Sequence, residues 1–108
     1  MTVMARRLAR AVAASVLVLG PALAVGDVTR VVMKSVDYAP KQARVHVGDA
    51  VEWQNQDIVA HTASAKDKSW EVNVLPGRTG RVVMNVPGTF DYICRYHPNM
   101  TGEIVVEP

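Results

Sequence analysis

The 108-residue chain has a single cysteine, Cys94, so no disulfide can form within it. Small exported domains commonly use paired cysteines, whereas a lone cysteine is a free thiol, an intermolecular link or a metal ligand. A binuclear copper centre and covalent haem attachment each need two cysteines and are excluded. The chain has only three histidines, too few for the trinuclear cluster of a multicopper oxidase. We therefore do not expect an enzyme.

Long apolar runs are absent except near the start of the chain. Three arginines precede an apolar run at 11–19, whose only polar member is Ser15, and a small-residue cleavage motif ends at Ala24. This order predicts a secretory signal peptide over residues 1–24, since the run is too short to span a membrane. The residues around the Arg6-Arg7 pair fit a twin-arginine export signal poorly, which favours the general secretory route; an uncleaved anchor is the alternative. Residues 25–108 remain as one domain.

An excess of one charge is also missing from residues 25–108. All ten acidic residues lie there with nine Lys and Arg, which gives a formal charge of −1. No basic tract remains that would indicate nucleic-acid binding. A domain this small can draw a material part of its stability from a bound metal.

Helical periodicity is lacking after residue 25, where short β-rich runs alternate with turn residues. Pro76-Gly77 has the order of a type II turn. The runs predict an all-β fold, an antiparallel β-sandwich of about seven to eight strands. The expected strands are 29–34, 44–47, 50–53, 58–63, 70–74, 79–86, 89–94 and 102–107.

Cys94, His97 and Met100 stand at C-x₂-H-x₂-M spacing near the end of the chain. Cys94 should end one strand, Met100 should precede the next, and His97 should lie on the loop between them. A short loop can wrap three ligands around one ion, whereas a straight strand sends alternate side chains to opposite faces. Methionine is a poor zinc ligand, while one Cys, two His and a weak axial Met form the donor set of a blue-copper site.

The second histidine ligand must come from elsewhere in the chain. His61, near the end of the apolar run 58–63, is the expected ligand, because strand alternation around His46 turns that side chain towards solvent. Each residue alone has a structural explanation: Cys94 as a buried thiol, Met100 as core filling, and His97 as a satisfied loop histidine. Their joint spacing favours a metal site. A Cys-His hydrolase would leave Met100 without a role.

Two segments resemble the cupredoxin family. Residues 45–57, followed by His61, are similar to its V-x-V-G-D-x-V-x-W-x-N-x-D…H pattern, and residues 88–100 resemble the ligand loop of its short-loop members, the amicyanins. The resemblance covers nearly all of residues 25–108 and implies a Greek-key sandwich. It further implies one type 1 copper ion, held by His61, Cys94, His97 and Met100.

The resemblance also implies a function. Single electrons would pass between periplasmic redox partners by Cu(I)/Cu(II) cycling, with His97 as the point of exchange. Amicyanins take electrons from an amine dehydrogenase and pass them to a c-type cytochrome, so a dehydrogenase donor and a cytochrome acceptor are expected for a monomer without a membrane span. A periplasmic copper carrier or buffer is the alternative.

Some residues depart from the family pattern. Thr62 replaces an asparagine that ties the two ligand segments together, and Arg95-Tyr96 replaces a Thr-Pro pair between the Cys and His ligands. Asn99 replaces an aromatic residue, which makes the surface around His97 less apolar. Pro98 has no N–H to offer the cysteine sulfur. Pro98→Ala is therefore expected to add a donor and raise the reduction potential.

Overall fold

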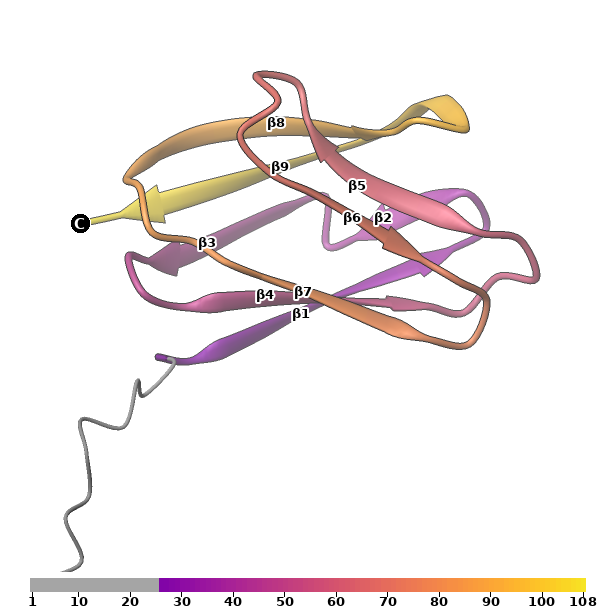
Figure 1. Ribbon diagram of the computed structural model, residues 1–108, viewed down its shortest axis with the longest axis horizontal. Helices are drawn as coiled ribbons and strands as arrows, with labels where there is room; N and C mark the ends of the chain where they lie inside the picture. Colours follow the sequence, from indigo (N-terminus) through magenta and orange to yellow (C-terminus); the bar gives the residue numbers. More distant parts are fainter. Residues whose placement is uncertain (1–25) are drawn as a thin grey trace, which may run out of the picture.

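The computed structural model describes residues 26–108, so the predicted signal peptide, 1–24, lies outside the described residues (Figure 1). Within residues 26–108 no helix could cross a membrane. The described chain folds into strands β1 (Val28–Lys34), β2 (Asp37–Ala39), β3 (Gln42–His46), β4 (Ala50–Asn55), β5 (His61–Ala65), β6 (Glu71–Val74), β7 (Thr79–Val83), β8 (Gly88–Cys94) and β9 (His97–Glu107).

The strands form two stacked sheets, ordered β2-β1-β4-β7 and β3-β9-β8-β5-β6 (Figure 1). The predicted all-β sandwich is confirmed. Most strand pairs are antiparallel, as predicted, but β1 pairs with β4 and β3 with β9 in parallel. Both pairings join strands that do not follow each other along the chain, so no turn signal reveals them. The prediction also missed β2, which has only three residues.

An aromatic cluster fills the space between the sheets. Trp53 and Tyr92 are completely buried, and the Tyr92 ring lies 4.5 Å from that of Tyr38 and 5.6 Å from those of Trp53 and Trp70. β9 passes close to this cluster at Gly102, where an added Cβ would lie 2.4 Å from the Tyr92 ring. Such packing fixes β8, the strand that ends in the cysteine.

The predicted strand 58–63 was wrong in its bounds, because the strand begins and ends later in the chain. β5 begins at His61, and the residues before it form a loop in which Ile58 is 94% exposed. The buried Asn55 holds this loop by donating a 2.8 Å hydrogen bond to the carbonyl of Val59. An apolar run alone could not reveal this, because polar side chains such as Asn55 hold the loop.

Candidate metal centre

Three predicted ligands meet at one end of the sandwich. Cys94 ends β8, and His97 begins β9 directly after a two-residue turn, so the two residues pair across the hairpin. His61 begins β5, the strand beside β8. The expectation that His97 lies on a loop and Met100 precedes the next strand was wrong, since β9 contains both. The pairing of β8 with β9 shifts between Ile93 and Cys94. Ile93 pairs with Thr101 and Cys94 with His97, so the shift accommodates residues 98–100 of β9.

The donor atoms converge on the cysteine sulfur. Cys94 Sγ lies 3.7 Å from His61 Nδ1 and 3.7 Å from His97 Nδ1, and all three atoms lie within 4.8 Å of one another. Cys94 and His61 are completely buried, while His97 is half-buried. Met100 is 1% exposed and belongs to the same core cluster as Cys94. A thiolate and two imidazoles, with a buried thioether in the same core, fit the donor set of type 1 copper.

Asp57 holds the buried His61. Its Oδ2 lies 2.7 Å from His61 Nε2, and its two oxygens also accept hydrogen bonds from the backbone N–H groups of Ser35 (2.7 Å) and Val36 (3.0 Å). Burial raises the pKa of Asp57, but the bonds from Val36, His61 and Ser35 outweigh it and hold the pKa below its usual value. The ionised carboxylate accepts a hydrogen bond from Nε2–H, which leaves the Nδ1 lone pair facing the sulfur.

The two N–H groups that reach Asp57 belong to a tight turn between β1 and β2. Ser35 and Val36 have φ of 53° and 56°, the left-handed pair that a two-residue type I′ hairpin requires. Asn-Gly is the usual choice there, and a β-branched residue with positive φ is strained. The bond to Asp57 offsets this strain, so the turn and His61 stabilise each other.

Thr62 connects the two ligand segments. β5 and β8 are paired only at Ser64 and Ala65, and closer to the site side-chain bonds replace the ladder. The backbone N–H of Thr62 donates to Cys94 Sγ at 3.4 Å, and its Oγ1 accepts from the backbone N–H of Arg95 at 2.9 Å. The Tyr38 hydroxyl donates to the Thr62 carbonyl. Burial raises the pKa of Tyr38, so the hydroxyl keeps its proton.

The remaining predicted residues lie around this site or far from it. His46 is exposed and lies 3.6 Å from the Glu107 carboxylate, away from Cys94. Pro98 and Asn99 are exposed beside His97; the influence of Pro98 on the potential stays a prediction. The sequence reasoning missed Asp57 as a partner of His61, although the aspartate ends the first quoted motif. The signal that could have revealed this partner was the position of Asp57, four residues before His61.

Comparisons with known proteins agree with this geometry. A family model described as "Cupredoxin-like domain" matches residues 8–106. Amicyanin-alpha of Methylorubrum extorquens is 35% identical over 85 residues, which cover 73% of this chain and 71% of that protein. The crystal structure of amicyanin from Paracoccus versutus has a TM-score of 0.67 at 24% identity and covers 76% of this chain and 83% of that one.

A structure of the Cu(I) form of a methionine-to-alanine mutant of amicyanin is also similar. It has a TM-score of 0.66 at 26% identity and covers 78% of this chain and 86% of that one. One type 1 copper ion is the cofactor that these relatives and the donor set imply. The chain belongs to the cupredoxin-like family, and amicyanins are among its relatives.

Proposed function

We propose that this protein is an exported, periplasmic electron carrier that holds one type 1 copper ion with His61, Cys94, His97 and Met100. The approach of two Nδ1 atoms to one buried thiol, each at 3.7 Å, carries this proposal. Bound copper would supply a one-electron Cu(I)/Cu(II) couple. The protein itself makes and breaks no covalent bond in a substrate.

The surroundings of the ligands favour rapid electron transfer. Asp57 fixes the His61 ring, and Thr62 binds both Cys94 and the residue after it. Ligands held by such bonds move little when the charge at the site changes, and small rearrangement keeps the barrier low. The N–H of Thr62 also withdraws electron density from the sulfur, which favours the reduced state.

His97 is the proposed point of electron exchange. It is half-buried, whereas Tyr96, Pro98 and Asn99 beside it are exposed, so a partner can approach its ring. A periplasmic dehydrogenase as donor and a c-type cytochrome as acceptor are the partners proposed for a monomeric carrier. The similarity to amicyanin-alpha of Methylorubrum extorquens supports this assignment.

Burial argues against the alternative function as a copper carrier or buffer. A protein that hands copper to a partner needs donors that the partner can reach. Here Cys94 and His61 are completely buried and Met100 is 1% exposed, so the site favours retention of the ion.

The first test is the colour of the copper-loaded protein. Oxidised protein should show an intense thiolate-to-copper band in the red part of the visible spectrum, which reductant bleaches. Cys94→Ser should abolish the band and His61→Ala should disrupt it, while His46→Ala, the matched control, should leave it intact. Colourless oxidised protein contradicts the proposal. Voltammetry should show a reversible one-electron couple; release of copper on reduction would instead indicate a carrier.

A further inference from the structure

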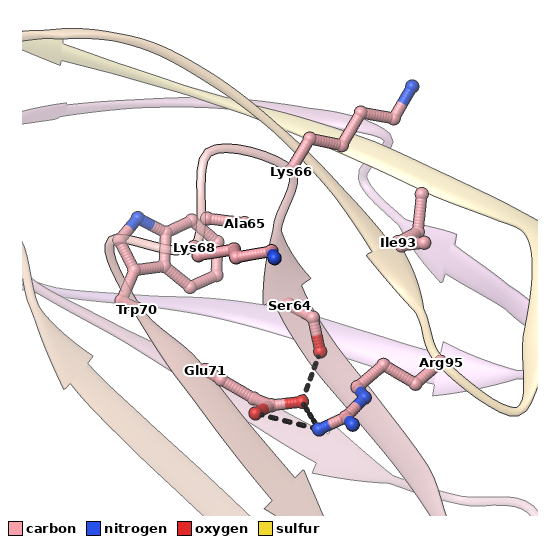
Figure 2. A pocket seen from close by; sticks show the side chains of 8 residues that line it. All are labelled: Ser64, Ala65, Lys66, Lys68, Trp70, Glu71, Ile93 and Arg95. Atoms are coloured by element: carbon pink, nitrogen blue, oxygen red, sulfur yellow. Dashed lines mark hydrogen bonds and ion pairs between the residues drawn. The ribbon is translucent and has the colours of Figure 1, made fainter.

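A closed ring of hydrogen bonds lies beside Cys94. The backbone N–H of Arg95 donates to Thr62 Oγ1 at 2.9 Å, Thr62 Oγ1 lies 2.9 Å from Ser64 Oγ, and Ser64 Oγ donates to Glu71 Oε1 at 2.8 Å. The Arg95 guanidinium returns to both oxygens of Glu71, at 2.8 and 3.1 Å. Figure 2 shows Ser64 and Arg95 reaching the same carboxylate. The ring thus begins and ends on Arg95.

The charge of Glu71 sets the direction of the two hydroxyl bonds in the ring, since the N–H groups of Arg95 can only donate. Hydrogen bonds from Arg95 and Ser64 hold the pKa of Glu71 below its usual value, so its carboxylate only accepts. Ser64 must therefore spend its one proton on Glu71, and Thr62 must donate to Ser64. The Thr62 oxygen is then left to accept from the Arg95 N–H. Bonds aligned in this way polarise and strengthen one another.

The ring lies between the surface and the cysteine. Ser64 is 7% exposed and Thr62 2%, while Glu71 and Arg95 line an open groove of about 510 Å³. At its buried end, Thr62 donates to Cys94 Sγ. Strand β6 also contacts the other residue of the turn between Cys94 and His97. Asn73, two residues after Glu71 in β6, accepts a 3.3 Å hydrogen bond from the Tyr96 hydroxyl. Edge strand β6 thus holds both residues of the turn between Cys94 and His97.

We propose that Glu71, Ser64 and Arg95 are positioning residues that fix the turn carrying Cys94 and His97 and maintain the N–H···S bond from Thr62. This role in tuning copper rests on the proposed function, whereas the ring itself needs no metal. An ordinary exposed ion pair contributes little, and its loss would not be felt at Cys94. The property to test is therefore whether a change at Glu71 alters the turn and the N–H···S bond at Cys94.

Hydrogen exchange in the metal-free protein tests the ring directly. Glu71→Gln keeps the shape of the side chain but removes the charge that orders the bonds. The Arg95 backbone amide should exchange roughly three- to tenfold faster, the range that corresponds to loss of one hydrogen bond. Glu107→Gln is the matched control. It breaks the Arg44 ion pair, whose side-chain exposures of 64% and 42% match the 65% and 42% of Arg95 and Glu71. Unchanged Arg95 exchange in Glu71→Gln overturns the proposal.

Ser64→Ala provides a second test without a change of charge. The Glu71–Arg95 pair stays, but its connection to Thr62 is cut. Arg95 exchange should again accelerate, and the copper-loaded variant should have a lower potential because the N–H···S bond weakens. An unchanged exchange rate, or an unchanged potential with the blue band present, overturns the proposal. If no blue band forms even in the unmodified protein, the proposed function fails, while exchange in metal-free protein still decides the ring.

Discussion

Asp57 connects a strained turn to a buried histidine. Its carboxylate accepts three hydrogen bonds, from Ser35, Val36 and His61. A carboxylate on the outer nitrogen of a metal-binding histidine fixes the tautomer and makes the other nitrogen a stronger donor. At the residue scale, this contact leaves Nδ1 of His61 as the nitrogen that can bind a metal cation.

Asp57→Asn should weaken Cu(II) binding and raise the reduction potential. An amide has one acceptor oxygen where the carboxylate has two, so its NH₂ must face at least one of the three donors. Loss of such a partner typically reduces metal affinity about 10- to 100-fold, and a weaker imidazole donor disfavours Cu(II). Competition with a chelator measures the affinity and voltammetry the potential.

Asp49→Asn is the matched control for this experiment. Asp49 also accepts two backbone N–H groups, from Asp27 and His46, but it has no contact with the ligands. Stability should fall in both variants, and copper affinity only in Asp57→Asn. Equal affinities in the two variants would show that Asp57 merely supports the fold.

The cluster of His61, Cys94 and His97 could be predicted from the sequence, while most of its hydrogen-bond partners could not. Cys94, His97 and Met100 lie within seven residues, so local spacing carries the information. Contacts from Tyr38 to Thr62 and from Glu71 to Arg95 join residues 24 positions apart. They arise only when the sheets pack, and no local pattern encodes that.

At the scale of elements, ion pairs across neighbouring strands stabilise the sheet of β1, β4 and β7. Glu52 in the middle strand accepts hydrogen bonds from Arg81 at 2.8 Å and from Arg30 at 3.0 Å. These bonds hold the pKa of Glu52 below its usual value, and the bond from Arg81 has the larger effect. The β1–β4 pairing is parallel and was not predicted, so neither was this triad.

Glu52→Gln should destabilise the metal-free protein at neutral pH and not in acid. Since the folded pKa is the lower one, the carboxylate stabilises the fold above its unfolded pKa of about 4.3. That contribution disappears as pH falls through the folded value. Urea unfolding of both proteins should thus differ at pH 7 and converge near pH 2. An equal difference at both pH values would mean that Glu52 acts through packing.

At the scale of the whole molecule, contacts within the protein hold the residues of the proposed site. Two sheets and an aromatic core fix β5, β8 and β9, and Asp57 and Thr62 form hydrogen bonds with His61 and Cys94. In zinc fingers, by contrast, the metal supplies most of the folding energy. The folded protein should therefore survive removal of copper but lose the stability that comes from binding.

Metal-free protein should accordingly unfold cooperatively at a lower midpoint than copper-loaded protein. A ligand at 100 times its dissociation constant adds about 2.7 kcal/mol, which corresponds to an increase in Tm of roughly 10–20 °C for a domain of this size. Thermal unfolding followed by circular dichroism, with and without copper, measures the difference in Tm. In Cys94→Ser, copper should raise the Tm only slightly. A metal-free chain without a cooperative transition would mean that copper organises the fold, and the geometry of Cys94 and His97 would then depend on the ion.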